Sequence, residues 1–217
     1  MTRILPQASN SIPQSIQILK RGGVVAHAAD TCYGLLGDFL NQDSLKKIQQ
    51  LKGRQANKPM SVMLPLSHKG RVGEYTQLNE FSAQVCKQLL PGPVTLVLPK
   101  GSRVPEWYFP ETNLIGLRIP DSQEVQELLE AFGNPLITTS ANPSAQPVCR
   151  SPQEVINAFG GQENVLELVL ESKQELGHLP STVIQVDDHF LHVLRSGPMS
   201  EDEIQEKLKG LKFEIAS

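Results

Sequence analysis

The chain has 217 residues, of which 39% are hydrophobic and 20% are charged, and its formal net charge is -3. This composition is ordinary for a soluble globular protein, and the slight negative balance argues against a protein that coats nucleic acid by charge alone. The sequence shows no apolar run near the roughly 18 residues of a membrane span, no secretory signal and no cysteine framework, so we expect a cytoplasmic protein without membrane association.

Short apolar segments bounded by glycine or proline predict strands along the chain. These strands span residues 23–27, 60–64, 94–98, 115–119, 136–139, 165–170, 182–186 and 191–194. Stripes of apolar residues, three or four positions apart, predict helices between them. The stripes are Ile12, Ile16 and Leu19, then Leu45, Ile48 and Leu51, then Phe81, Val85 and Leu89, and finally Val125, Leu128 and Leu129.

Capping residues indicate where several helices begin. Asn79 precedes the third stripe, and Asp121 with Glu124 precedes the fourth. Residues 151–154 combine an N-cap serine, a first-turn proline and a third-position glutamate, which together open a helix. Residues 200–203 have a similar serine and glutamate and predict a last helix.

The order of these elements predicts one α/β domain that spans residues 1–217. Strands and helices are mixed, and no long linker divides the chain. Since strands and helices do not alternate strictly, the pattern favours a mixed sheet over a fully parallel one. The last two predicted strands flank Asp187 and Asp188 and should form an antiparallel hairpin.

A basic run stands out against the negative net charge. Residues 46–58 contain five lysines or arginines and no acidic residue. Within it, the spacing of Lys52, Arg54 and Lys58 would allow them to surround a polyphosphate. Lysine would act as a point charge, and arginine would donate bidentate hydrogen bonds. Gly53 would let the backbone approach such a ligand. The alternative interpretation is a solvent-exposed basic surface without a ligand, which is where most runs of charged residues lie.

Two polar segments directly follow predicted strands. Residues 30–35, Asp-Thr-Cys-Tyr-Gly-Leu, place a carboxylate and two hydroxyl groups where α/β folds often bind ligands, or they form a plain loop with a capping aspartate. Residues 138–144, Thr-Thr-Ser-Ala-Asn-Pro-Ser, offer donors to an anion or sugar, or they form a Ser/Asn turn. Cys32 has no apparent base nearby, which favours a buried thiol over a nucleophile.

Arg118 lies between apolar Leu117 and Ile119 on a predicted strand. A guanidinium buried there requires an anionic partner, either a substrate carboxylate or an internal Asp or Glu. The five histidines form no HExxH pattern, so we expect no protein-built metal site, and no P-loop or dinucleotide glycine fingerprint occurs.

Eight short motifs occur together in a fixed order between about residue 12 and residue 198. They are Gly22-Gly23-Val24-Val25-Ala26, Asp30-Thr31-x-Tyr33-Gly34-Leu35, Lys52-x-Arg54 with Lys58-Pro59, Pro91-Gly92-Pro93-x-Thr95, Arg118-x-Pro120, Ser140-Ala141-Asn142-x-Ser144, Ser181-Thr182-Val183 and Arg195-x-Gly197. Each motif is weak alone, but together they resemble the YrdC family. Within that family the chain is similar to the short, TsaC-type threonylcarbamoyl-AMP synthases, which lack an extra C-terminal domain.

The resemblance implies a single-domain α/β fold with an open, twisted mixed sheet, flanking helices and a concave cavity, and a C-terminal helix at about residues 200–210. It implies a nucleotidyltransferase that converts L-threonine, bicarbonate and ATP, with Mg²⁺, into threonylcarbamoyl-AMP and pyrophosphate. The product would feed a threonylcarbamoyl-transferase complex that modifies tRNA. Whether the chain itself binds tRNA or other RNA is left open by the resemblance.

The resemblance also assigns residue roles by matching motif positions. Threonine would be held by Thr31, Arg118, Ser140 and Ser181, and the nucleotide by Lys52, Arg54, Lys58, Asn142, Ser151 and Arg195. Lys52 and Arg54 would be the catalytic residues, since they would neutralise the polyphosphate and stabilise the departing pyrophosphate. The chain departs from the family at Ala28-Ala29, where Pro-Thr is usual, and at Gln55, where proline is frequent. The first departure puts the shape of that loop and its affinity for threonine in question.

Two other functions stay open. One is a related domain that transfers an adenylyl group to a different carbamoyl compound, as in hydrogenase maturation. The other is a non-catalytic RNA-binding module, against which the net charge and the scarcity of aromatic residues count.

Overall fold

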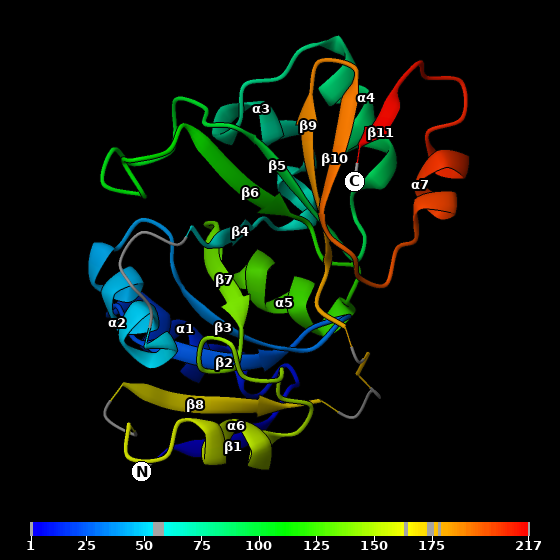
Figure 1. The fold of residues 1–217 in the computed structure, drawn as a ribbon. Coiled ribbons are helices and arrows are strands. Elements are labelled where there is room, and N and C mark those ends of the chain that lie inside the picture. The colour runs from blue at the N-terminus through cyan, green and yellow to red at the C-terminus, as the bar shows by residue number, and fades with distance from the viewer. Residues whose placement is uncertain (1, 54–58, 163–164, 173–175, 178, 217) are drawn as a thin grey trace.

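The computed structural model describes residues 2–53, 59–162, 165–172, 176–177 and 179–216. The strands of this part of the chain form one sheet with the order β1-β8-β2-β3-β7-β4-β6-β5-β9-β10-β11 (Figure 1). They are β1 (Arg3–Pro6), β2 (Val24–Ala28), β3 (Tyr33–Asp38), β4 (Ser61–Met63), β5 (Val94–Pro99), β6 (Leu114–Arg118), β7 (Leu136–Ser140), β8 (Leu166–Glu171), β9 (Thr182–Asp187), β10 (Phe190–Arg195) and β11 (Glu214–Ala216). Parallel and antiparallel pairs alternate irregularly, so the prediction of a mixed sheet is confirmed.

The helices lie on both faces of this sheet. They are α1 (Ile12–Lys20), α2 (Gln42–Lys52), α3 (Val72–Tyr75), α4 (Glu80–Leu89), α5 (Gln123–Phe132), α6 (Pro152–Ala158) and α7 (Glu201–Lys207), with a 3₁₀ helix at Leu66–Arg71. Among these described helices, none is long and apolar enough to cross a membrane.

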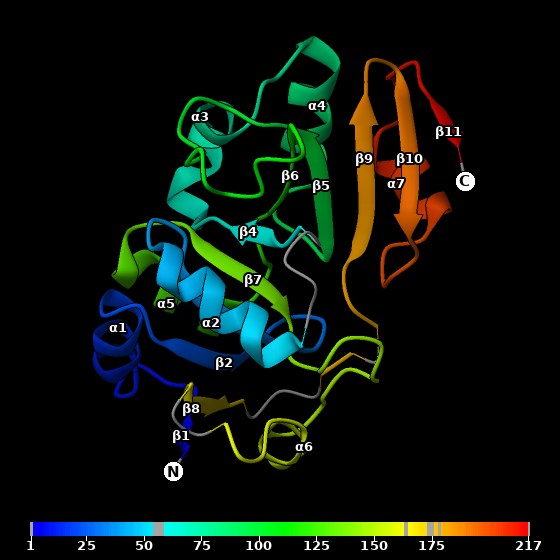
Figure 2. The same ribbon diagram turned by 60° about the vertical axis from the view of Figure 1, so that its left-hand side comes forward.

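Two cores explain this layering. Helices α1 and α5 pack together and bury Leu19 and Leu129 against Val25 of β2 and Leu36 of β3 (Figure 2). Helix α2 belongs to the larger second core, which contains Ile48 and the strand residues that alternate with those of the first core. Because successive side chains of a strand point to opposite faces, one strand supplies both cores.

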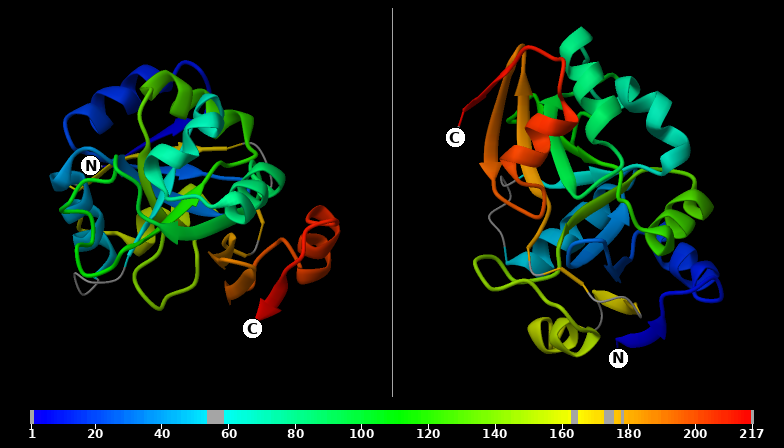
Figure 3. Two further views of the ribbon diagram at one scale, coloured as in Figure 1. Left: turned by 90° about the horizontal axis from the view of Figure 1, so that it is seen from above. Right: turned by 90° about the vertical axis from the view of Figure 1, so that its right-hand side faces the viewer.

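The C-terminal part of the chain forms the other end of the sheet. Strands β9 and β10 pair antiparallel across Asp187 and Asp188, so the predicted hairpin is confirmed. Figure 3 shows α7 against this hairpin and away from the N-terminal helices. Strands β1 and β11 are the two edges, which places the two ends of the chain at opposite ends of the sheet.

The structure corrects the predicted elements in three places. Residues 33–35 belong to the central strand β3 rather than to a loop, and the short edge strands β1 and β11 were not predicted. In β3 two glycines interrupt the apolar pattern because a side chain would not fit there. A Cβ at Gly34 would lie 2.8 Å from Nε2 of His27, and one at Gly37 would lie 2.9 Å from Ile48 of α2.

The capping predictions are confirmed at three helices and wrong at a fourth. Asn79 accepts a hydrogen bond from the amide of Ser82 at the start of α4, and Ser200 and Glu203 form a complete capping box at α7. Ser151 caps α6. Helix α5 instead begins after Ser122, whose side chain makes no capping bond, so the predicted cap at Asp121 is wrong.

Candidate active-site cavity

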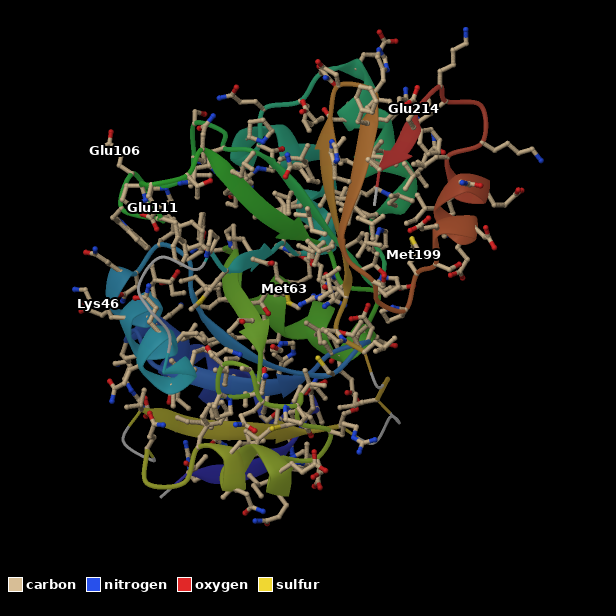
Figure 4. The ribbon with its side chains drawn as sticks, viewed as in Figure 1. Lys46, Met63, Glu106, Glu111, Met199 and Glu214 are labelled. Carbon is tan, nitrogen blue, oxygen red and sulfur yellow. The ribbon has the colours of Figure 1, made fainter. Side chains whose placement is uncertain are left out.

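A cavity of about 380 Å³ lies where the two halves of the sheet meet. Its lining comes from β2, β3 and β7 on one side, from β5, β6, β9 and β10 on the other, and from β4 between them. Figure 4 places Met63, one of the lining residues, near the middle of the molecule, whereas Lys46 and Glu106 extend from its outer surface. The volume is within the usual range for small-molecule sites.

Arg118 ends β6, lines this cavity and forms an ion pair with Asp30, which is not itself a lining residue. Its Nη2 donates to Oδ1 of Asp30, and its Nη1 donates to Oγ1 of Thr31 at 3.3 Å. The Arg118 and Asp30 side chains are only 6% and 12% exposed. The internal acid that the sequence left unspecified is therefore Asp30. The buried Nε of Arg118 has no hydrogen-bond partner among the described residues.

Lys52 is the last residue of α2, and it is 1% exposed. Its Nζ donates to the carbonyl of Ser140 at 2.7 Å and to Oδ1 of Asn142 at 2.9 Å. The Lys52 carbonyl accepts from the amide of Ser144 at 3.0 Å. Gly53 ends the helix in the left-handed conformation, with φ of 55°. Lys52 thus holds the loop after β7 against the end of α2.

A second cluster, from β5, β10 and the residue before β9, also lines the cavity. Nη2 of Arg195 donates to the carbonyl of Ser181 at 2.7 Å and to its hydroxyl at 3.2 Å. The hydroxyl of Ser181 also shares a hydrogen bond with Thr95 at 2.8 Å. This network fixes the end of β10 against the start of β9.

The structure brings together most of the residues that the sequence singled out. The predicted residues that line the cavity are Thr31, Arg118, Ser140, Ser181 and Arg195. Lys52 and Asn142 join them through Ser140. Ser151 is not part of the lining, and its hydroxyl accepts from the amide of Glu154 at 3.2 Å.

The other predicted cations, Arg54 and Lys58, lie outside the described residues. Their assigned roles and that of Ser151 stay predictions. Pro59, which follows Lys58, lines the cavity.

Sequence reasoning missed His27, which also lines the cavity. The side chain is fully buried, and neither ring nitrogen has a hydrogen bond of normal geometry to a described residue. Burial, together with the positive charge of Arg118, lowers the pKa of His27 to about 3, although the nearby backbone of Ala28 offsets part of this effect. The ring is therefore neutral at physiological pH. No sequence motif marks it, because its importance depends on burial.

Cys32 also lines the cavity and is 5% exposed. Burial raises the pKa of its thiol, an effect that Arg118 partly opposes. The prediction that this thiol is buried is confirmed, and its raised pKa disfavours the thiolate. Within the described ranges, no group of three or more His, Cys, Asp or Glu residues is arranged to hold a metal ion.

The neutral His27 should make stability depend on pH. Between pH 6.5, the ordinary pKa of histidine, and about pH 3, near its pKa in the folded protein, His27 is protonated only in the unfolded chain. The unfolding free energy therefore decreases as the pH falls below 6.5. When the pH falls from about 7 to about 4.5, the unfolding free energy of the wild type should decrease by roughly 2–3 kcal/mol more than that of His27→Leu. Urea unfolding at both pH values measures this difference. Equal losses in both proteins would contradict it.

Comparisons with known proteins agree with this geometry. A family model named Sua5_yciO_yrdC, described as "Telomere recombination", matches residues 17–197. The threonylcarbamoyl-AMP synthase of Vibrio cholerae is 32% identical over 190 residues, which are 86% of this chain and 97% of that protein. A putative threonylcarbamoyl-AMP synthase of Methanocaldococcus jannaschii is 30% identical over 176 residues, 81% of this chain and 80% of that protein.

Solved structures share the fold. The crystal structure of P. abyssi Sua5 complexed with L-threonine superposes with a TM-score of 0.87 at 26% identity, over 99% of this chain and 63% of that one. E. coli YciO superposes with a TM-score of 0.80 at 25% identity, over 91% of this chain and 97% of that one. The expected open, twisted mixed sheet with flanking helices is confirmed.

Proposed function

The chain belongs to the Sua5/YciO/YrdC family, and from that premise we propose that it is a threonylcarbamoyl-AMP synthase. It is an enzyme of the nucleotidyltransferase type, which joins L-threonine, bicarbonate and ATP and releases pyrophosphate. The observation that carries this proposal is a small-molecule-sized cavity lined by the buried cation Arg118, which is paired with Asp30, in a fold whose P. abyssi neighbour was solved with L-threonine. The two alternative functions are not favoured by relatives that carry the synthase name.

The charges of Arg118 and Asp30 are complementary to the carboxylate and ammonium groups of an amino acid. The threonine carboxylate would accept from the buried Nε–H of Arg118, which has no partner in the described part of the chain. The ammonium group would lie toward the carboxylate of Asp30. The hydroxyl groups of Thr31, Ser140 and Ser181 line the same cavity and complete the polar surroundings of the substrate.

The chemistry joins two anions. The threonine ammonium group first loses a proton to solvent, and the resulting amine and bicarbonate then form a carbamate with loss of water. A carbamate oxygen then attacks the α-phosphorus of ATP, and the bond to pyrophosphate breaks with its electron pair leaving on the pyrophosphate oxygen. Positive charge must offset the mutual repulsion of the reactants, so positioning and electrostatics carry most of the rate. The proposed charges are Arg54, Lys58 and Arg195 near the nucleotide, with Asn142 and Ser151 as uncharged contacts.

Lys52 would act from beneath the loop of residues 140–144. Its ammonium already donates to Ser140 and Asn142, so it holds the loop that we place beside the nucleotide. Its positive charge also acts through this short, buried network on negative charge that develops at the phosphates. Lys52 is thus a positioning residue as well as a source of positive charge.

The metal, partners and compartment belong to the same proposal. Mg²⁺ would arrive on the phosphates of ATP, since the described residues offer no cluster of metal ligands. The product would pass to a transferase complex that modifies tRNA. We place the protein in the cytoplasm, where ATP and tRNA are available.

Pyrophosphate release tests the function directly. We expect the purified protein to release pyrophosphate from MgATP only when L-threonine and bicarbonate are both present, and to respond less to L-serine and L-alanine. Mass spectrometry should detect threonylcarbamoyl-AMP. ATP turnover that is independent of threonine, or none with all three substrates, would overturn the proposal. Strongly salt-dependent RNA binding without turnover would favour the RNA-binding module.

A further inference from the structure

Two residues of the cavity lining carry buried nitrogen atoms without a hydrogen-bond partner in the described part of the chain. They are His27, at both ring nitrogens, and Arg118, at Nε. The other buried side-chain atoms of this kind, on Ser44 and His68, belong to residues outside the cavity lining. Native proteins seldom leave buried polar atoms unsatisfied, so such atoms in a cavity wall indicate where a ligand or water binds.

The place of His27 in the sheet is closely defined. It lies on β2 directly opposite Gly34 of β3, and a Cβ at Gly34 would come within 2.8 Å of Nε2. The glycine therefore leaves the space that the imidazole occupies. A neutral imidazole has one N–H donor and one bare nitrogen that accepts. A ligand group that both donates and accepts would satisfy it.

Two of the hydroxyl groups that line the cavity already have partners. Oγ1 of Thr31 accepts from Arg118, and the hydroxyl of Ser181 pairs with Thr95. The charged groups of an amino acid substrate have oppositely charged counterparts in the pair formed by Arg118 and Asp30. A neutral histidine is a weaker partner than either of these for a full charge. What remains of threonine is its side-chain hydroxyl, which both donates and accepts.

We propose that His27 is a specificity-determining residue that hydrogen-bonds the side-chain hydroxyl of the amino acid substrate. This inference rests on the proposed function and names the group that selects the substrate within the same cavity. A site built to hydrogen-bond a substrate hydroxyl rejects the analogue that lacks it, because its own polar atoms are then left unpaired.

The test compares L-threonine with L-2-aminobutyrate, which has the same skeleton without the hydroxyl. Isothermal titration should show that the wild type binds threonine at least about tenfold more tightly. His27→Leu should lose this preference by binding threonine about tenfold more weakly while its affinity for 2-aminobutyrate stays the same. His27→Gln keeps one donor and one acceptor and should recover part of the preference. His68→Leu is the matched control, since His68 also has an unpaired buried nitrogen but lies outside the cavity lining.

Each outcome decides the proposal. Equal affinity of the wild type for the two amino acids, or equal weakening of both by His27→Leu, would overturn the role of His27. So would a change confined to the KM for bicarbonate. These results are distinguishable from failure of the proposed function, because pyrophosphate release by the wild type would still require threonine. If His27→Leu does not fold, His27→Gln decides: a partial loss of the threonine preference supports the role of His27, and an unchanged preference overturns it.

Discussion

Lys52→Met should lower threonine-dependent pyrophosphate release by about two orders of magnitude or more. Methionine keeps a similar apolar length, but it removes the donor to the Ser140 carbonyl and to Oδ1 of Asn142. The loop after β7 loses its anchor, and the site loses a buried positive charge. Leaving these acceptors unsatisfied should also cost about 1–3 kcal/mol of unfolding free energy. Initial rates of pyrophosphate release and urea unfolding measure the two effects.

The same helix provides the control. Lys46 also lies on α2, but its side chain is 62% exposed and pairs with Asp43 at the surface, where Figure 4 shows it extending outward. Lys46→Met should keep the wild-type rate and change stability by less than about 0.5 kcal/mol. A wild-type rate in Lys52→Met would refute the role of Lys52. An equal loss of rate in Lys52→Met and Lys46→Met would show that the effect comes from losing any positive charge on α2 and not from the contacts of Lys52.

Arg118→Met should abolish measurable threonine binding and destabilise the protein by about 3–5 kcal/mol. The substitution leaves the carboxylate of Asp30 buried without its partner, and that side chain is only 12% exposed. It also removes the Nε–H donor that we assign to the threonine carboxylate. Isothermal titration with threonine and urea unfolding separate the binding effect from the stability effect.

A double variant separates those two effects further. Arg118→Met with Asp30→Asn removes both charges, and replacing a whole buried pair often restores most of the stability that one removal costs. We expect unfolding free energy near that of the wild type but no recovery of threonine binding. Recovered binding in the double variant would show that Arg118 only neutralises Asp30 and does not contact the substrate.

Local patterns were sufficient for most of the secondary structure. The helix from Phe81 to Leu89 was predicted from one apolar stripe and a cap, and the structure has both. Strand β3 was missed because Gly34 and Gly37 break its apolar pattern, and the reason for those glycines lies in other elements. The predicted cap at Asp121 was wrong because a short-range pattern fits two neighbouring starting points.

The sequence alone also required Arg118 to have an anionic partner, since the cost of burying a guanidinium depends only on its charge and its apolar neighbours. It could not say which acid, because Asp30 lies 88 positions away and is brought there by the pairing of the strands. Likewise, nothing local distinguishes His27 from the other histidines, and only its place in the cavity lining makes its unpaired nitrogens meaningful. Hydrophobic periodicity and charge can be read from neighbouring residues in the chain. The burial of a side chain and the identity of its interaction partners depend on how distant strands pair.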